Sequence, residues 1–162
     1  MIIAIDGPAA AGKGTLARGV SKHLNLAYLD TGLLYRAVGK KVLDAGKIPE
    51  NAAVAEAIAR ELETDDLNAE GLRLDNVSQA ASKVSAVPGV RAALLDFQQD
   101  FAKNPPAGYK GAVLDGRDIG TIVCPSATAK LFITASTEVR ATRRFKELHQ
   151  AGTGAIYARV LE

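Results

Sequence analysis

Residues 7–15 read Gly-Pro-Ala-Ala-Ala-Gly-Lys-Gly-Thr, and this stretch decides the fold. It follows the unbroken apolar run of residues 1–5, which predicts a strand buried on both faces, as in parallel sheets. After it, Leu16, Val20 and Leu24 recur every four residues, which marks one face of a helix. The order of strand, glycine-rich turn and helix N-terminus is the context that a phosphate-binding loop (P-loop) requires.

Such a loop binds phosphate through its backbone. Glycines allow N–H groups to turn inward around anionic oxygens, and the helix N-terminus adds the positive end of its dipole. Lys13 is expected to place a point charge on the β- and γ-phosphates of a bound nucleotide. The strict motif has Ser or Thr directly after this lysine, whereas here Gly14 stands there and Thr15 follows. The residues of this candidate phosphate-binding loop are Gly7, Pro8, Ala9, Ala10, Ala11, Gly12, Lys13, Gly14 and Thr15.

The remaining pattern predicts an α/β protein. Short apolar runs at residues 27–29, 112–115 and 130–133 predict three more strands, and stretches with helical spacing separate them. This alternation implies a parallel, doubly wound sheet in a three-layer α/β/α arrangement. Residues 63–75 are polar without a clear period and are interpreted as an exposed insertion. Residues 116–125 are predicted to form a loop.

Two arginines follow predicted strands. Arg36 comes after the second strand, and Arg117 lies in residues 115–121, Asp-Gly-Arg-Asp-Ile-Gly-Thr, after the third. In an open parallel sheet, segments that follow the carboxyl ends of strands face the ligand crevice. Both guanidinium groups are therefore candidates to bind an acceptor phosphate with paired hydrogen bonds, although surface arginines would give the same pattern.

Thr15 and Asp115 are the candidate Mg²⁺ ligands. Asp115 ends an apolar strand, as the metal-binding acid of P-loop enzymes does. An aspartate is also a common turn former at such a position, so both interpretations stay open.

Composition narrows the class of partners. A net charge of +2, without a basic stripe, does not favour nucleic-acid binding. No apolar run approaches the roughly 20 residues that a membrane span needs. The single cysteine, Cys124, and the N-terminus without a secretory signal favour a cytoplasmic protein. No Asn-Lys-x-Asp run that would read guanine is present, which argues against a GTPase.

Four segments, residues 7–15, 29–36, 80–91 and 114–121, resemble cytidylate kinase of the bacterial type. The resemblance spans the chain, and the Asp-Gly-Arg-Asp-Ile-Gly-Thr segment is its most specific part. It implies ATP-dependent phosphorylation of CMP and dCMP to CDP and dCDP by a monomeric enzyme with Mg²⁺ as cofactor. It implies that residues 7–15 bind the phosphates of ATP, and that Lys13 and Arg117 are catalytic. The acceptor-binding residues that it implies are Thr31, Arg36, Ser82, Arg91, Arg117 and Asp118.

The resemblance also predicts the domain organisation. We expect a single nucleoside monophosphate kinase domain with its core at residues 1–62 and 103–140, and an acceptor-binding insertion at about 63–102. A lid is expected to begin at about 140–162, and the family continues into a C-terminal part that these residues lack. The expected lid residues are Arg140, Arg143 and Arg144, which could instead form one solvated helix face.

The acceptor phosphate is mostly a dianion at pH 7, so the chemistry needs no side-chain general base. Two other functions remain open from the residues alone. A P-loop kinase for a small acid or alcohol would need a base, for which Asp30 is the candidate. A nucleotide-binding module without turnover is the other.

Overall fold

The computed structural model describes residues 1–150. They divide into two compact units, unit 1 from Met1–Leu29 and the chain from Phe101 onward, and unit 2 from Asp30–Asp100. The elements in chain order are β1 (Ile2–Asp6), α1 (Lys13–Leu24), β2 (Ala27–Asp30), α2 (Thr31–Asp44), α3 (Ala52–Arg60), η1 (Thr64–Asn68), α4 (Asp75–Val84), α5 (Pro88–Lys103), β3 (Ala112–Gly116), η2 (Ile119–Val123), β4 (Ala129–Phe132) and α6 (Thr137–Gln150).

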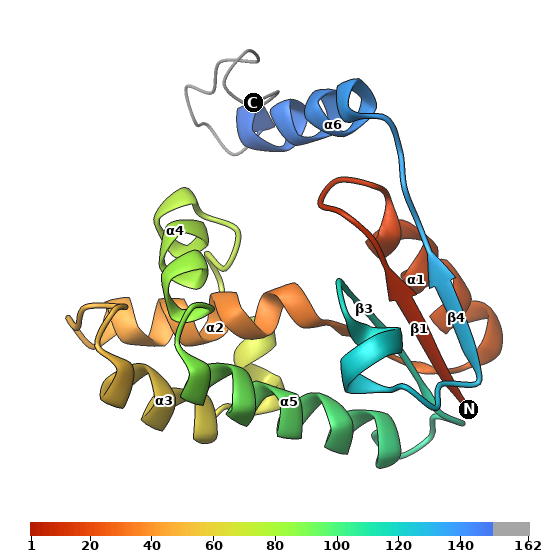
Figure 1. The fold of residues 1–162 in the computed structure, drawn as a ribbon, viewed down its shortest axis with the longest axis horizontal. Helices are drawn as coiled ribbons and strands as arrows, with labels where there is room; N and C mark the ends of the chain where they lie inside the picture. The colour runs from red at the N-terminus through yellow and green to blue at the C-terminus, as the bar shows by residue number, and fades with distance from the viewer. Residues whose placement is uncertain (151–162) are drawn as a thin grey trace. The chain divides into compact units, whose positions relative to one another are not determined.

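The four strands form one sheet in the order β2-β3-β1-β4. Figure 1 shows β1 between β3 and β4. The central strand β1 pairs in parallel with β3, where Asp6 lies opposite Gly116, and with β4, where Asp6 lies opposite Phe132. All four strands lie within one residue of the bounds expected from the sequence. The predicted parallel α/β fold is therefore confirmed.

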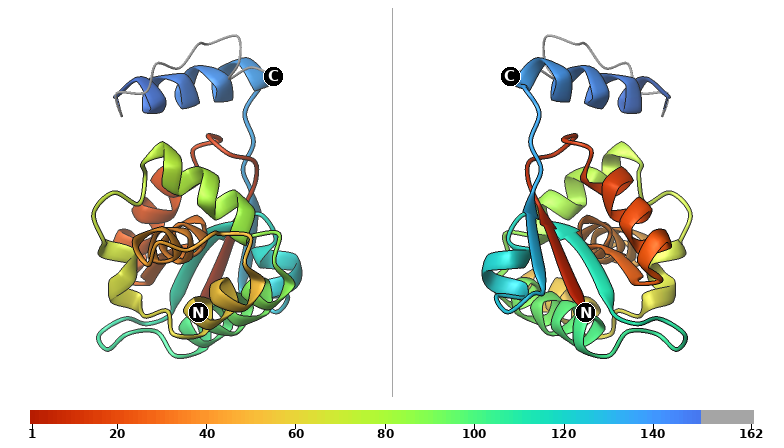
Figure 2. Two further views of the ribbon diagram at one scale, coloured as in Figure 1. Left: turned by 90° about the vertical axis from the view of Figure 1, so that its left-hand side faces the viewer. Right: turned by 90° about the vertical axis from the view of Figure 1, so that its right-hand side faces the viewer.

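Helices lie on both faces of this sheet in unit 1. Helix α1 packs against β1 and β3 on one face, and the short helix η2 contacts the same two strands on the other (Figure 2). The core between α1 and the sheet contains Ala17 from the helix together with Ile3, Ile5, Leu26 and Val113. The predicted helix is present, but Leu16 and Leu24 are 38% and 40% exposed, and Ala17 is its buried residue.

One sequence prediction is wrong in unit 1. Residues 116–125 were expected to form a loop, but Ile119–Val123 make a single π-helical turn. The carboxylate of Asp6 accepts hydrogen bonds from the backbone amides of Ile119 and Gly120 and so supports this turn. The composition of residues 116–125 could not indicate this turn, because Asp6, which supports it, lies more than 100 residues away in the sequence.

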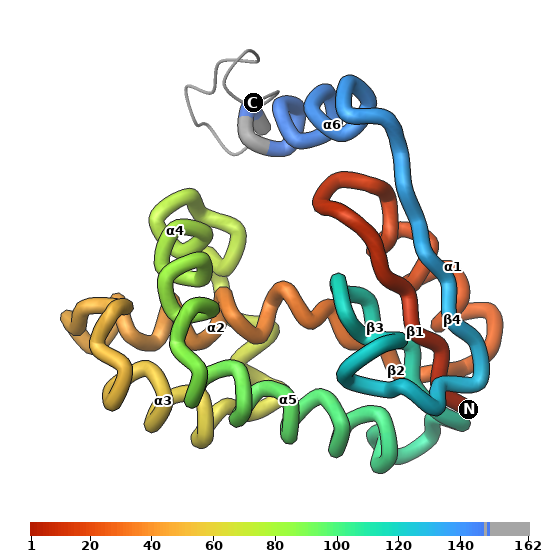
Figure 3. Tube along the Cα trace, viewed as in Figure 1, coloured from red at the N-terminus to blue at the C-terminus, as the bar shows by residue number. Residues whose placement is uncertain are grey.

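Unit 2 is helical, and its trace runs through α2, α3, η1 and α4 into the first part of α5 (Figure 3). Helix α2 packs most closely against α4. At Gly39 the two backbones approach so closely that an added Cβ would lie 2.9 Å from the Ala81 amide nitrogen. Leu34, Val38 and Val42 are fully buried along α2. The core of unit 2 is therefore centred on α2.

The stretch 63–75 differs in part from its interpretation as an exposed insertion. Helix η1 has no buried residue, as expected, but Leu72 is buried with 5% of its surface exposed. Unit 2 begins at Asp30, and within it α2 packs against α3, η1 and α4. The division into core, acceptor-binding insertion and lid stays a prediction. Among residues 1–150, no helix combines the length and the apolar character that a bilayer span needs.

Candidate functional site

The loop between β1 and α1 has a backbone that only certain residues can adopt. Gly7 and Gly12 have φ angles of 147° and 101°, and Ala10 has a φ of 57°. A Cβ at Gly7 would collide with the carbonyl oxygen of Ile133. Gly12 is the N-cap of α1 in the left-handed region, where glycine carries no steric penalty. These glycines therefore let the chain turn sharply at the N-terminus of α1.

Lys13 turns back over this loop. Its ammonium group Nζ donates a hydrogen bond to the Pro8 carbonyl oxygen at 2.9 Å, and the side chain is half-buried. The first turn of α1 itself contains no acidic residue, and the helix N-terminus carries the positive end of the helix dipole. The loop thus combines an ammonium group with a helix N-terminus, and both favour an anion.

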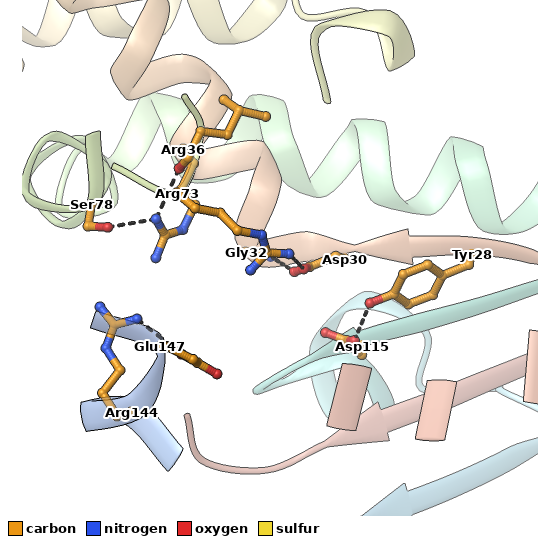
Figure 4. Close-up of polar contacts among 10 residues, drawn as sticks. Tyr28, Asp30, Gly32, Arg36, Arg73, Ser78, Asp115, Arg144 and Glu147 are labelled. Carbon is orange, nitrogen blue, oxygen red and sulfur yellow. Dashed lines mark hydrogen bonds and ion pairs between the residues drawn. The ribbon is translucent and has the colours of Figure 1, made fainter. Parts of the chain in front are cut away.

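A hydrogen-bonded cluster surrounds Gly14. The Tyr28 hydroxyl donates to Asp115 Oδ2 at 2.6 Å (Figure 4), and the guanidinium carbon of Arg18 lies 5.6 Å from the centroid of the Tyr28 ring. A Cβ at Gly14 would lie 3.3 Å from Arg18 Nη2 and 3.4 Å from both Asp115 Oδ2 and the Tyr28 hydroxyl. A side chain at this position would therefore contact all three members of the cluster.

The two candidate metal ligands differ in exposure. Thr15 is exposed in the first turn of α1, whereas Asp115 at the end of β3 is buried with 6% of its surface exposed. Within the described part of the chain, no group of three or more His, Cys, Asp or Glu residues could hold a metal by itself. A divalent ion here would need further ligands from water or from a nucleotide.

Arg117 and Asp118 lie between β3 and η2. The Asp118 carbonyl oxygen accepts from the amides of Ile122 at 2.9 Å and Val123 at 3.2 Å, which closes the π-helical turn. The Arg117 side chain is exposed and makes no hydrogen bond or ion pair with residues 1–150. Its position is therefore set by the backbone on either side of it.

The three arginines of α6 have different partners. Arg143 Nη1 donates to the carbonyl oxygens of Ala10 at 3.2 Å and Ala11 at 2.9 Å. Arg140 Nε donates to the Ala135 carbonyl oxygen, and Arg144 pairs with Glu147 at 3.3 Å. Arg143 therefore contacts the loop between β1 and α1, whereas Arg140 and Arg144 bond within residues 135–147.

Arg36 is held in place within unit 2. Its Nη1 donates to the Leu72 carbonyl oxygen at 3.0 Å and to the Ser78 hydroxyl at 2.6 Å (Figure 4). Two hydrogen bonds to separate segments fix the orientation of this half-buried guanidinium group. Arg36 is thus ordered by the protein before any ligand binds.

The other predicted acceptor residues are dispersed over three helices of unit 2. Thr31 is buried in the first turn of α2, and Ser82 and Arg91 are exposed on α4 and α5. The carboxylate of Asp30 accepts from the Gly32 amide at 3.1 Å as the N-cap of α2. This capping role disfavours Asp30 as a general base.

The sequence of this chain matches a known protein family. The family model for cytidylate kinase matches residues 3–162. The chain belongs to the cytidylate kinase family.

Curated cytidylate kinases match almost the whole chain. The protein of Paramagnetospirillum magneticum is 66% identical over 160 residues, which cover 99% of this chain and 75% of that protein. The proteins of Rhodospirillum rubrum and Azorhizobium caulinodans are each 60% identical, over 94% and 99% of this chain and 71% and 76% of those proteins. The resemblance of the four sequence segments to this family is confirmed.

Sequence reasoning missed three residues of this chain. Tyr28 contacts the core and also hydrogen-bonds Asp115. Ser78 and Asp6 were not singled out, although Ser78 accepts a hydrogen bond from Arg36 and Asp6 holds the segment that follows Arg117. The one available signal was Asp6 itself, an acid directly after a buried apolar strand.

Cys124 has no role in this chemistry. Burial raises the pKa of its thiol, and the Lys103 ammonium offsets this only in part. A buried thiol with a raised pKa is a poor nucleophile at neutral pH.

Proposed function

We propose that this chain transfers the γ-phosphoryl group of ATP to CMP and dCMP, which forms ADP and CDP or dCDP. The observation that carries the proposal is the phosphate loop of a cytidylate kinase sequence, with Lys13 held over it by the Pro8 carbonyl oxygen. Phosphoryl transfer requires mainly positioning and neutralisation of charge, which backbone amides and fixed cations supply.

The donor phosphates are assigned to residues 7–15. Their anionic oxygens would accept from the loop amides at the N-terminus of α1, where the helix dipole favours negative charge. Lys13 would place its ammonium group on the β- and γ-oxygens, where charge changes during transfer. The Lys13 ammonium already lies over the loop, so little reorganisation is needed when ATP binds.

Mg²⁺ would be held with ATP by Asp115 and Thr15. One carboxylate and one hydroxyl form a suitable protein contribution, because Mg²⁺ keeps several waters and takes its other ligands from nucleotide phosphates. Asp115 Oδ2 accepts from Tyr28, which fixes the direction of the carboxylate. When bound, the ion would neutralise phosphate charge during transfer.

The acceptor nucleotide is assigned to residues that the family resemblance implies. Arg36, oriented by Leu72 and Ser78, is proposed to bind the acceptor phosphate together with Arg117. The guanidinium forks suit phosphate because each can donate two parallel hydrogen bonds. The residues proposed to contact the remainder of the acceptor are Thr31, Ser82, Arg91 and Asp118.

Helix α6 is proposed to begin the lid. Arg143 already contacts the carbonyl oxygens of Ala10 and Ala11, and Arg140 and Arg144 lie on the same helix. Bound phosphates would offer these guanidinium groups anionic oxygens, which are stronger acceptors than backbone carbonyl oxygens. We further propose a monomeric, cytoplasmic enzyme without a nucleic-acid or membrane partner.

The proposal is tested by measuring ADP release from ATP and Mg²⁺ with CMP, dCMP, UMP, AMP and shikimate as acceptors. Turnover with CMP and dCMP well above the others is the expected result. K13A is the negative control, and K22A is the matched control because Lys22 is exposed on the same helix. Preferential turnover of shikimate or AMP would overturn the acceptor assignment, and ATP binding without ADP release would favour a module without turnover.

A further inference from the structure

Asp6 uses both oxygens of a buried carboxylate to hold another segment of unit 1. It is the last residue of β1, and only 8% of its surface is exposed. Its Oδ1 accepts from the Ile119 amide and its Oδ2 from the Gly120 amide, each at 2.8 Å. Burying a carboxylate is unfavourable unless it is well hydrogen-bonded, so this pairing is structurally specific.

These two amides belong to the first turn of η2. The first amides of a helical turn have no partner inside the turn, and Asp118 provides no side-chain cap. Ile119 and Gly120 are both buried, so their amides would be costly to leave without acceptors. Asp6 therefore acts as the cap of η2 from a distant position in the sequence.

The same carboxylate restrains the segment that carries Arg117. On one side of Arg117, Gly116 is held opposite Asp6 by the pairing of β1 with β3. On the other side, Ile119 and Gly120 are held by the Asp6 carboxylate. Only residues 117 and 118 lie between these two anchors, so their backbone has little freedom.

We propose that Asp6 is a positioning residue for the acceptor reaction, because it fixes the backbone that presents Arg117. This inference rests on the proposed function, in which Arg117 binds the acceptor phosphate. Asp6 acts through two backbone amides and not through contact with either nucleotide. It thereby links the strand that leads into the phosphate loop to the segment that carries the acceptor-binding arginine.

The decisive variant is D6N. An amide side chain has the same shape, but it offers one acceptor oxygen and directs N–H donors at the second backbone amide. The packing is kept while one of the two hydrogen bonds is lost. A second variant, G120A, perturbs the same contact from the other side, since its Cβ would lie 3.3 Å from Asp6 Oδ2 and 3.1 Å from Lys130 Cδ.

The experiment is a double-mutant cycle of D6N with R117A in the full chain, with KM measured separately for CMP and ATP. D6N alone is expected to raise the KM for CMP by about tenfold, as one lost hydrogen bond to a charged group predicts. The KM for ATP should change by less than about twofold. In the R117A background, D6N should add almost nothing, because the residue on which it acts is gone.

T128V is the matched structural control. The Thr128 hydroxyl accepts from the Ile2 amide at 3.1 Å, so this variant also removes a side-chain hydrogen bond to β1, but at its other end. It should leave both KM values unchanged even if the melting temperature falls.

Several outcomes would overturn the inference. A purely structural role would make the effects of D6N and R117A add, or would raise both KM values equally. If R117A has no effect on the KM for CMP, the proposed role of Arg117 is overturned as well. If R117A does raise this KM but D6N adds to it in full, only the role of Asp6 is overturned. If D6N does not fold, G120A takes its place in the cycle, and the same expectations apply.

Discussion

The Tyr28 hydroxyl donates a hydrogen bond of 2.6 Å to Asp115 Oδ2, and so joins β2 to the carboxyl end of β3 beside the phosphate loop. Asp115 is buried, and the two residues are 87 positions apart in the sequence. A short hydrogen bond to an ionised oxygen is stronger than one between neutral groups. Tyr28 therefore orients the carboxylate that is proposed to hold Mg²⁺. Tyr28 itself is not proposed to contact either nucleotide.

The first prediction concerns Y28F. Loss of the hydroxyl should leave the Asp115 carboxylate less constrained, so we expect a lower kcat and a higher Mg²⁺ concentration at half-maximal rate. The free energy of unfolding should fall by about 1–3 kcal/mol, because a buried acceptor loses a donor. Y109F is the control, since Tyr109 is 48% exposed. An unchanged Mg²⁺ dependence in Y28F would contradict the proposed role of Asp115.

The second prediction concerns Lys13. K13A should lower kcat by about 10²–10³-fold, which is typical for removal of one group that stabilises the transition-state charge. Its melting temperature should stay close to that of the wild-type chain, because only one part-buried hydrogen bond, to the Pro8 carbonyl oxygen, is lost. K22A should retain full activity. A K13A variant with normal kcat would remove Lys13 from the catalytic site.

The fold was predictable where the signal is local. The apolar run before residues 7–15, the glycines within them and the helical spacing after them are adjacent in the sequence, and all three predictions are confirmed. The π-helical turn at Ile119–Val123 was not predictable, because it depends on Asp6. Hydrophobic spacing likewise predicted the helix α1 but could not show that Ala17 is its buried residue.

The candidate site, like the fold, was predictable only where the signal is local in the sequence. Lys13 and the loop glycines follow from a motif with a physical mechanism, whereas the contact between Tyr28 and Asp115 depends on strand order. The bonds from Arg36 to Leu72 and Ser78 depend on how unit 2 packs. A single sequence does not report such pairings, and only folding brings these groups together.

The third prediction contrasts two glycines in helices. G39A should lower the free energy of unfolding by about 1–3 kcal/mol, because its Cβ would press on the backbone of Ala80 and Ala81 at 2.9–3.1 Å. G19A should instead raise it by about 0.5–1 kcal/mol, because Gly19 is exposed in α1 with nothing within 4 Å of the new Cβ. Chemical denaturation measures both. Equal effects of the two substitutions would contradict the close packing of α2 on α4.

The fourth prediction concerns Arg143. R143A removes the contacts with the carbonyl oxygens of Ala10 and Ala11, and we expect a larger rise in the KM for ATP than for CMP. The reason is that this guanidinium group lies at the loop proposed to bind the donor phosphates. K146A on the same helix is the control, because Lys146 is exposed. A selective rise in the KM for CMP would reassign Arg143 to the acceptor.

The last prediction concerns pH. Burial raises the pKa of Asp66, but its hydrogen bond from the Glu63 amide and its pairing with Lys41 outweigh this, so the pKa lies below its ordinary value of 3.8. A carboxyl whose pKa is lowered by folding stabilises the folded state above its unfolded pKa, and this contribution is lost as pH falls through the folded pKa. D66N should therefore be less stable than the wild-type chain at pH 7, and the difference should shrink below about pH 4.

Asp44 provides the matched control for this pH dependence. Its pair with Lys40 has the same 2.7 Å distance as the pair of Asp66 with Lys41, but the Asp44 side chain is 60% exposed and that of Asp66 only 25%. Solvent screens the exposed pair, so D44N should change the free energy of unfolding little at any pH. Denaturation at pH 7 and pH 3 separates the two variants. A D66N deficit that persists unchanged at pH 3 would show that its cause is lost packing and not charge.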